Sequence, residues 1–512
     1  MKNLSHWADI AAKKVTNRSK KKAYTCAAGI TPSGTVHIGN FREIITTDIV
    51  VKALEKLGKK VKFIYSWDDY DRFRKVPKNV PKELEKYIGL PLSEVPDPFK
   101  CHKSYAEHFE KEVENSLKNL EMDIEFIRQN EMHKKCKYSK QIKEVLNKRN
   151  KIKNILNKYR KEPFKEYWPL TVYCEKCKKD STEILNYDKN YEIQYKCECG
   201  FSNKIDFRKK GIVKLKWRSD WCARWIYEKV DFEPGGKDHF AAGGSYETGK
   251  QIIKEVWNKE APDYVIYEWI SIKGGKEFSS STGEVTNIDS VLEIYEPEIL
   301  RWIFAGTRPG AGFSISFDLD VLKLYEDFDY CERIYFNKEK INNKKEESKQ
   351  KRIYELSNLK IPKKLPEQPS FRHMTVLVQT YEGDIEKAIK GYKSPRVKKR
   401  AECAWNWIQK YAPEEMKFKV HKKIPEKIKK SLNEKQIQTL KELINKLKKK
   451  SYTQQSLFEE FYKICKKVDI KNTDFFKGAY LALIGKEKGP KLAPFILVLG
   501  KNRIIEILKQ LS

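Results

Sequence analysis

The stretch AYTCAAGITPSGTVHIGN, residues 23–40, decides the fold. It opens with a short apolar run that predicts a strand, TPSG breaks the run, and a helical pattern follows from His37 to Leu57. VKFIYSW, residues 61–67, predicts a second strand. Strand, helix and strand in succession form a βαβ unit, in which the strands are parallel and the crossover is right-handed. The sequence therefore predicts an α/β fold with a Rossmann-like parallel sheet.

The loop between this strand and this helix has the composition of a phosphate-binding turn. Small residues at Gly29, Ser33 and Gly34 let the backbone approach a ligand closely. The start of the helix, with His37 and Gly39 in its first turn, offers free N–H groups and a partial positive charge to an anion. The alternative is a histidine whose hydrogen bonds are satisfied within a helix cap.

An acidic run, Asp68, Asp69 and Asp71, follows the second strand. Ligands of parallel sheets bind beyond the carboxyl ends of the strands, so we expect these carboxylates to face the same cleft as His37. Because carboxylates repel phosphate, this position suits a cation such as a substrate ammonium or Mg²⁺. The alternative is a solvated loop in which the aspartates pair with Arg72 and Arg74.

Alternating elements return after Gly211 and predict that the sheet is split by an insertion. The expected strands are residues 211–217 and 264–272, and the expected helices are residues 219–230 and 247–260. After about Phe317 the sequence contains few patterns typical of strands. Basic helical segments such as EKQIQTLKELINKLKKK, residues 434–450, then predict an α-helical tail.

The insertion carries two close pairs of cysteines, Cys174-x₂-Cys177 and Cys197-x-Cys199. Four thiolates in two pairs match a tetrahedral structural Zn²⁺ site, and such a site leaves no open position for catalysis. The alternative is a chance cluster of reduced thiols.

The chain has 512 residues, and its 104 Lys+Arg against 71 Asp+Glu give a net charge of +33. Such an excess attracts polyanions and favours a nucleic acid partner, unless it only reflects a lysine-rich proteome. With 40% apolar residues the composition is that of a folded protein, and no apolar run is long enough to cross a bilayer. The N-terminal residues lack a secretory signal, so we expect a cytoplasmic protein without a membrane anchor.

The pattern TPSGTVHIGN resembles the HIGH signature of class I aminoacyl-tRNA synthetases, with Asn40 where the second histidine usually stands. Residues 270–285, ISIKGGKEFSSSTGEV, resemble the KMSKS loop of these enzymes. They depart from it at Glu277, Phe278 and Thr282, so Lys276 or Lys273 must supply the positive charge of the loop. The alternative is a plain serine-rich turn.

Residues 235–250, GGKDHFAAGGSYETGK, resemble the glycine-rich region that lines the adenosine and amino-acid pocket of the family. They also fit the glycine and lysine spacing of a P-loop, but Gln251 occupies the position that would hold Mg²⁺. Together with the acidic run, WRSDWCARW and GKEKGPKLAPFI, these motifs closely resemble the archaeal-type class I lysyl-tRNA synthetases.

The resemblance implies that ATP and Mg²⁺ activate L-lysine to lysyl-adenylate, which then passes to the terminal ribose of tRNA(Lys). The implied catalytic residues are His37, Gly39, Asn40 and Lys276. The implied ATP-binding residues are these four with Thr31, Pro32, Ser33, Gly34, Ser279, Ser280 and Ser281. The implied amino-acid-binding residues are Gly29, Thr31, Asp68, Asp69, Asp71, Trp217, Asp238, His239 and Gly243.

Five regions are expected on this basis. They are residues 1–133, the first half of the catalytic domain; 134–210, the zinc-binding insertion; 211–285, the second half with the KMSKS-like loop; 286–330, a stem-contact connection; and 331–512, an α-helical anticodon-binding region. We expect a monomer.

Two alternative functions stay open. The first is a class I synthetase for another amino acid such as glutamate, which the acidic run disfavours. The second is a catalytically impaired RNA-binding relative, which the altered KMSKS-like loop would suit.

Overall fold

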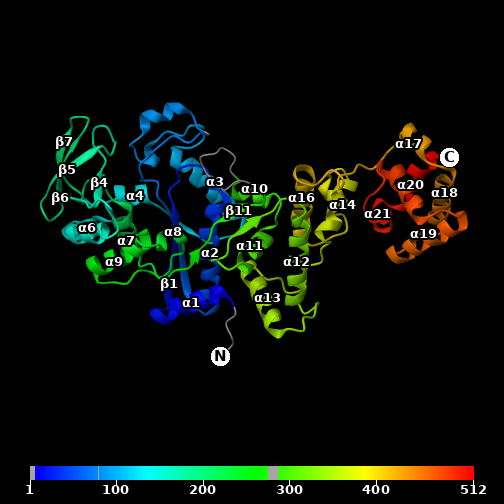
Figure 1. Cartoon of the computed structure of the whole chain (residues 1–512), viewed down its shortest axis with the longest axis horizontal. Helices are drawn as coiled ribbons and strands as arrows, with labels where there is room; N and C mark the ends of the chain where they lie inside the picture. The colour runs from blue at the N-terminus through cyan, green and yellow to red at the C-terminus, as the bar shows by residue number, and fades with distance from the viewer. Residues whose placement is uncertain (1–5, 79, 275–285, 512) are drawn as a thin grey trace. The chain divides into compact units, whose positions relative to one another are not determined.

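The computed structural model describes residues 6–78, 80–274 and 286–511 (Figure 1). The chain divides into two compact units. The first unit comprises residues 1–291, 297–315 and 337–361, and the second comprises residues 292–296, 316–336 and 362–512. Each unit therefore draws on more than one stretch of the chain.

A parallel sheet forms the centre of the first unit. β1 (Ala23–Ile30) pairs with β2 (Lys60–Trp67), which pairs with β3 (Glu125–Arg128), and α2 (Ile38–Lys56) makes the crossover between the first two. Almost every residue of α2 from Ile38 to Leu54 is buried, including the charged residues Arg42 and Asp48. The predicted βαβ unit is confirmed, and β3 was not predicted.

The sheet continues on the other side of β1 after a long excursion of the chain. Phe232 forms parallel bridges with Cys26 in β1 and with Asp263. Three residues later β9 (Gly235–Gly236) pairs in parallel with β10 (Ile266–Tyr267). The chain thus returns to the sheet beside the strand it first left, as the split predicts.

The strand predicted at residues 211–217 exists, but its place in the parallel sheet was wrong. β8 (Val213–Leu215) pairs antiparallel with β4 (Leu170–Val172). The reason is packing, because the apolar residues of both strands join one hydrophobic core that also contains Cys174, Cys197 and Trp221. That core runs from the cysteine-bearing sheet into α7 (Trp217–Glu228) and α9 (Ser245–Trp257).

The remaining elements of the first unit surround these sheets. They are α1 (Trp7–Arg18), α3 (Tyr105–Asn119), α4 (Gln129–Lys134), α5 (Ser139–Asn147), α6 (Arg149–Asn157), β5 (Thr182–Tyr187), β6 (Glu192–Cys197), β7 (Ser202–Asp206), α8 (Lys237–Phe240), β11 (Ile270–Ile272), α11 (Pro297–Gly306), β12 (Phe313–Ile315), α13 (Lys344–Ser357) and the short 3₁₀ helices Lys82–Tyr87 and Leu92–Glu94. α10 (Ile288–Leu292) follows the KMSKS-like stretch.

The second unit is helical, and its described residues contain no strand, as the sequence predicts. Its helices are α12 (Asp320–Tyr335), α14 (Phe371–Thr380), α15 (Ile385–Ala388), α16 (Pro395–Lys410), α17 (Glu426–Ser431), α18 (Glu434–Lys449), α19 (Gln454–Val468), α20 (Asn472–Ile484), α21 (Leu492–Leu499) and α22 (Lys501–Leu508), with a last 3₁₀ turn at Lys509–Leu511.

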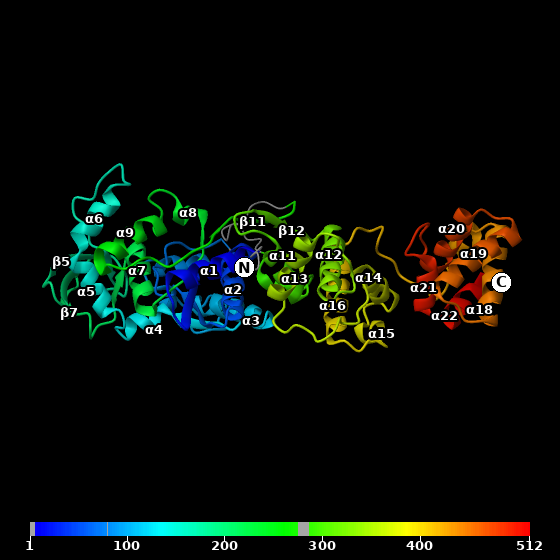
Figure 2. The same ribbon diagram turned by 90° about the horizontal axis from the view of Figure 1, so that it is seen from below.

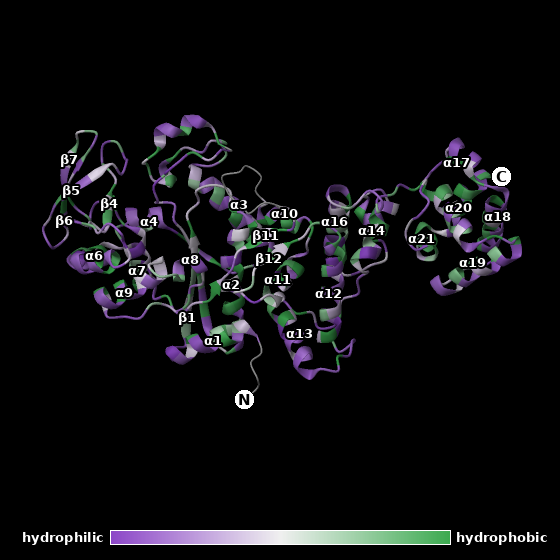
Figure 3. Ribbon diagram, in the orientation of Figure 1, coloured by the Kyte–Doolittle hydropathy of each residue, from purple (hydrophilic) through white to green (hydrophobic). Residues whose placement is uncertain are grey.

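The last five of these helices gather around one core (Figure 2). Capping boxes at Asn433 and Thr453 fix the starts of α18 and α19. Both helices carry apolar and hydrophilic residues side by side (Figure 3), and their apolar faces supply Leu443 and Phe461 to the core. Among the described residues, no helix has the length and apolarity that crossing a bilayer requires.

Candidate functional site

The HIGN motif forms the start of α2, directly after the loop that leaves β1. His37 is the N-cap residue, and its backbone N–H donates to Oδ1 of Asn40 at 3.3 Å. Asn40 therefore caps the helix in place of a second histidine. Burial lowers the pKa of His37, so its imidazole is neutral at pH 7. A neutral ring at a helix N-terminus can donate one N–H to an anion.

The chain that follows the KMSKS-like stretch lies against this motif. The N–H of Ile38 donates to the carbonyl of Thr286 at 2.9 Å, and His37 forms an antiparallel bridge with Asn287. Lys276, Ser279, Ser280 and Ser281, which were predicted to bind ATP, lie outside the described residues.

Gly29, at the end of β1, is glycine because of packing. A Cβ at this position would lie 2.6 Å from the carbonyl oxygen of Ser66 on the neighbouring strand. The N–H of Gly29 donates to Oε1 of Glu43 at 2.9 Å, and the hydroxyl of Tyr267 donates to Oε2 at 2.9 Å. Burial raises the pKa of Glu43 to about 8. The sequence analysis missed Glu43, because the same helix also contains Arg42 and Asp48, so that one more charged residue is no distinctive signal.

A second buried carboxylate lies close to Glu43. The indole N–H groups of Trp221 and Trp225 donate to the two oxygens of Glu233 at 3.0 and 2.6 Å. Burial raises the pKa of Glu233 to about 7, and the nearby charge of Glu233 contributes to the raised pKa of Glu43. Trp221 and Trp225 therefore hold a carboxylate, and the predicted pocket residue Trp217 stacks on Trp221 at 5.0 Å.

The three aspartates of the acidic run have three different environments. Asp68 is buried against the guanidinium of Arg224 at 2.5 Å. Asp69 is buried too, and its Oδ1 accepts the N–H of Asn130 at 2.7 Å. Asp71 is partly exposed and accepts from the hydroxyl of Thr31 at 2.9 Å.

The solvated-loop alternative is wrong, because two of these aspartates are buried and the pairing partner of Arg72 is Asp180, at 3.5 Å. The cations that do pair with the run come from elsewhere in the sequence. Lys214, on β8, contacts Asp71 at 2.8 Å and Asp220 at 3.2 Å. Sequence reasoning missed Lys214, and the signal available was a lysine between two apolar residues in a strand.

Asp220, on α7, completes this cluster, and Arg224 on the next turn of the helix contacts it at 2.8 Å. Two cations, Lys214 and Arg224, thus face three carboxylates, Asp68, Asp71 and Asp220. The surroundings of these ion pairs keep Asp220 ionised, because the positive charges of Lys214 and Arg224 outweigh burial and hold its pKa far below its usual range. The cluster is therefore a network of ion pairs that joins β8 and α7 to the loop after β2.

Two cavities divide the other predicted residues. Thr31, Ser33 and Asp71 line one of 260 Å³, together with the cationic side chains Arg72, Arg74 and Lys75. Trp217 and Gly243 line a second of 370 Å³. Neither of these two cavities is lined by Asp68, Asp69, Asp238 or His239. Asp238 is exposed on α8, and His239 is half-buried with its ring 5.5 Å from that of Trp221. Pro32 and Gly34 are buried within the loop after β1.

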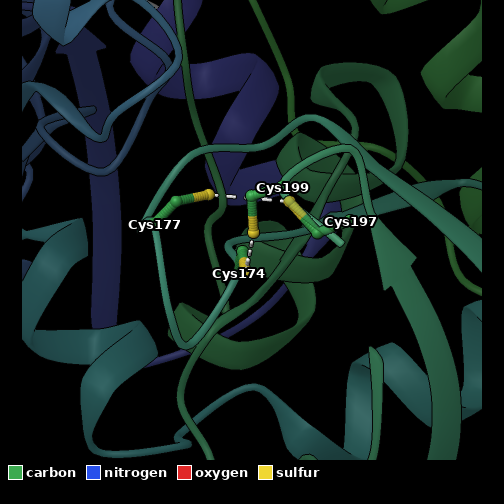
Figure 4. A group of neighbouring side chains, drawn as sticks. All are labelled: Cys174, Cys177, Cys197 and Cys199. Carbon is green, nitrogen blue, oxygen red and sulfur yellow. Dashed lines mark hydrogen bonds between the residues drawn. The ribbon is translucent and has the colours of Figure 1, made fainter. Parts of the chain in front are cut away.

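The side chains of the four predicted zinc ligands lie close together (Figure 4). The Sγ atoms of Cys174 and Cys199 are 3.7 Å apart, and those of Cys177 and Cys197 are 3.5 Å apart. Four sulfurs at about 2.3 Å from a tetrahedral zinc would lie about 3.8 Å from one another. The donor set and its spacing therefore fit a zinc ion.

A second group of metal-ligating side chains precedes and opens α3, and the sequence analysis missed it. Asp97, Cys101, His102 and His108 place one donor atom each within 4.8 Å of the others. The Cys101 sulfur lies 3.1 and 3.2 Å from the Nδ1 atoms of the two histidines and 3.3 Å from Asp97 Oδ2. The cluster was missed because its ligands are of three residue types with the spacing D-x₃-C-H-x₅-H. It has no pairs of cysteines like those that indicated the first cluster.

Comparison with known proteins places the chain in a family. A family described as tRNA synthetases class I (K) matches residues 5–360, and an anticodon binding domain matches residues 377–511. The chain belongs to the class I lysyl-tRNA synthetase family. A lysine–tRNA ligase of Borreliella burgdorferi is 45% identical, over 98% of both chains, and one of Pyrococcus horikoshii is 42% identical, over 99% of both.

Relatives of the family thus occur among bacteria and archaea, as the resemblance implied. Among solved structures, a glutamate tRNA ligase from Elizabethkingia meningosepticum covers 96% of this chain and 99% of its own, with 13% identity and a TM-score of 0.46.

Proposed function

We propose that the protein is a lysine–tRNA ligase that activates L-lysine with ATP and transfers it to tRNA(Lys). The observation that carries this proposal is the match, from one end of the chain to the other, with lysine–tRNA ligases of a bacterium and an archaeon. The site supplies the matching chemistry: a helix N-terminus for phosphate beside a carboxylate-rich cluster for a cationic amino acid.

Activation needs no general base. The α-carboxylate of lysine is ionised at neutral pH, its free pKa being roughly 3.3–3.7, and it attacks the α-phosphate directly. Negative charge then grows on the α-phosphate and on the departing pyrophosphate. His37, the N–H groups at the start of α2 and Lys276 are the protein groups proposed to stabilise it. Mg²⁺, when bound with ATP, neutralises part of the triphosphate charge.

The lysyl-adenylate then passes its acyl group to the 2′-hydroxyl of the terminal ribose of tRNA(Lys), and AMP leaves. The helical second unit is proposed to bind the anticodon region of the same tRNA. A monomeric state and a cytoplasmic location stay predictions.

Selection of lysine requires carboxylates that a wrong side chain would leave unpaired. Asp71, which is partly exposed beside Thr31, is proposed to anchor one ammonium of the substrate. Glu43, fixed by the Gly29 N–H and the Tyr267 hydroxyl, is proposed to face the other. An amino acid that lacks the second ammonium would leave Glu43 protonated and would lose the ion pair that lysine forms with it.

Both cysteine-containing clusters are proposed to bind structural zinc, one in the insertion and one at the start of α3. When bound, each ion cross-links a loop, and neither set of four protein ligands leaves a position for substrate.

Amino-acid-dependent ATP–pyrophosphate exchange, with tRNA present, tests the proposal. We expect exchange with lysine and none with glutamate, arginine or ornithine at equal concentration. Exchange with glutamate would identify a synthetase of different specificity, and no exchange with any amino acid would favour the impaired RNA-binding relative.

A further inference from the structure

The loop that follows β2 folds back on itself beside the carboxylate cluster. The N–H of Phe73 donates to the carbonyl of Leu90 at 2.7 Å, and the N–H of Leu92 donates to the carbonyl of Asp71 at 2.9 Å. The N–H of Gly89 continues this pattern by donating to the carbonyl of Phe73 at 3.0 Å. Asp71 and Gly89 therefore belong to one short ladder of backbone hydrogen bonds, on its two opposite segments.

This ladder contacts the segment that carries the first pair of cysteines. The carbonyl of Gly89 accepts the N–H of Asp180 at 3.0 Å. The φ of Gly89 is +99°, and a Cβ there would lie 3.3 Å from the Cβ of Lys179 and 3.4 Å from Oδ1 of Asp180. Glycine at this position therefore permits the close approach. Arg72 adds an ion pair with Asp180 at 3.5 Å, which contributes little because the arginine is half exposed.

Residues 174–179, the cysteine turn, are closed by backbone hydrogen bonds. The N–H of Cys174 donates to the carbonyl of Lys179 at 2.9 Å, and the N–H of Lys178 donates to the carbonyl of Cys174 at 2.9 Å. Cys174 and Cys177 are two of the four thiols of the first cluster. A zinc ion bound there cross-links the turn that ends at Lys179.

Two buried tyrosines make a second contact between the same two segments. The hydroxyl of Tyr173, the residue before the cysteine turn, donates to the carbonyl of Tyr70 at 2.9 Å. The hydroxyl of Tyr70 donates in turn to the carbonyl of Gly211 at 2.9 Å, and the two rings meet edge to face at 5.0 Å. Because Tyr70 directly precedes Asp71, the loop is held at two places, once beside this carboxylate and once at Gly89.

We propose that the cysteine turn and Asp180 position Asp71 for the substrate. When the first cluster holds zinc, the turn is closed, its contact with Gly89 keeps the ladder in place, and the ladder fixes Asp71 beside Thr31. Lys179 and Asp180 are positioning residues, since they act through Gly89. This inference rests on the proposed function, in which Asp71 anchors one ammonium of lysine. It gives the insertion a role in substrate affinity beyond its own folding.

The first test uses Gly89→Ala in the full chain and measures KM and kcat in lysine-dependent exchange, with tRNA present. The added methyl meets the cysteine turn and displaces the ladder. We expect the KM for lysine to rise about 10-fold with little change in kcat, because a misplaced Asp71 loses a charge-assisted contact that the bound substrate already makes. Calorimetry of lysine binding should show the same loss of affinity.

Gly58→Ala is the matched control. Gly58 has a φ of +73° in the turn between α2 and β2, and a Cβ there would meet nothing within 4 Å. The control therefore carries a comparable backbone strain without the contact, and its KM for lysine should equal that of the unsubstituted protein. Thermal unfolding of both variants checks that the fold is retained.

Hydrogen exchange of backbone amides, followed by mass spectrometry, gives a readout that does not depend on activity. Cys177→Ser should speed exchange at the amides of Phe73, Gly89 and Leu92, which donate the hydrogen bonds of the ladder. Amides of β2 that pair with β1 should keep their protection. In the double variant Cys177→Ser/Gly89→Ala, the KM for lysine should rise no further than in the stronger single variant, because both changes act through the same contact.

The inference is wrong if Gly89→Ala and Gly58→Ala have the same KM for lysine, or if Cys177→Ser loses its zinc while the ladder amides stay protected. Additive effects in the double variant, or a first cluster that binds no zinc in the unsubstituted protein, would also overturn it. Failure of the proposed function would instead appear as no lysine-dependent exchange in the unsubstituted protein, with faster hydrogen exchange in Cys177→Ser still observed.

Discussion

At the scale of the residue, His37 is proposed to act as a neutral hydrogen-bond donor to the reacting phosphate. Burial lowers its pKa, and it is the N-cap residue of α2. We expect His37→Ala to lower the rate of lysine activation about 10²–10³-fold, because it removes a donor that works in the transition state. The KM for lysine should change little. Steady-state exchange kinetics measure both.

His421→Ala, which removes a half-buried histidine of the second unit, is the control for this variant and should leave activation near its original rate. A large rise in the KM for lysine at an unchanged rate in His37→Ala would instead assign His37 to binding of the amino acid.

Glu43 should make the affinity for lysine depend on pH. Burial raises its pKa to about 8, so the carboxyl is mostly protonated at pH 6, whereas free lysine keeps its ammonium charge up to about pH 10. If Glu43 faces that ammonium, binding must ionise it, and the affinity for lysine should rise as the pH rises from 6 to 8. Calorimetry in two buffers of different ionisation enthalpy should show proton release.

Glu43→Gln should bind lysine more weakly and should lose this pH dependence. An affinity of the unsubstituted protein that is constant from pH 6 to 8 would remove Glu43 from the lysine site.

At the scale of the element, the sequence predicted those helices and strands whose apolar pattern extends over many residues. The run from β1 through α2 to β2 alternates apolar strands with a long helix, so its elements were predicted nearly to their ends. β3 has four residues, and the parallel bridges of Phe232 involve single residues, so neither leaves a periodic signal. The strand at residues 211–217 was predicted, but sequence periodicity does not show which sheet a strand joins.

The residues of the candidate site could likewise be predicted only in part. Loops that carry motifs, such as TPSGTVHIGN and the cysteine pairs, could be predicted because the spacing itself implies the chemistry. Lys214, Arg224 and Glu43 were missed, because a charged residue in a strand or helix identifies a site only when its buried partner is known.

The two cysteine-containing clusters predict two zinc ions per chain. Cys177→Ser should lose one of them and Cys101→Ser the other, since each removes one of four ligands. Elemental analysis of protein purified under reducing conditions measures the number. One zinc per chain, retained in Cys101→Ser, would show that the cluster before α3 is a network of hydrogen bonds only. No zinc at all would reject both sites.

At the scale of the whole molecule, the net charge of +33 indicated a polyanionic partner before any motif was considered. The family match is in keeping with such a partner, since a class I tRNA synthetase model matches residues 5–360 and an anticodon binding domain matches residues 377–511. The composition could predict attraction to RNA. It could not predict which side chains contact the RNA, because that depends on which side chains the fold leaves exposed.

The most direct test of the central claim is the charging of tRNA by the purified full chain. With ATP, Mg²⁺ and tRNA(Lys), we expect labelled lysine to become esterified to the tRNA, and neither glutamate nor arginine to be attached. Because the chemistry requires the 3′-terminal ribose, periodate-oxidised tRNA should accept no lysine. Charging with glutamate, or no charging with any amino acid while tRNA binds normally, would contradict the account.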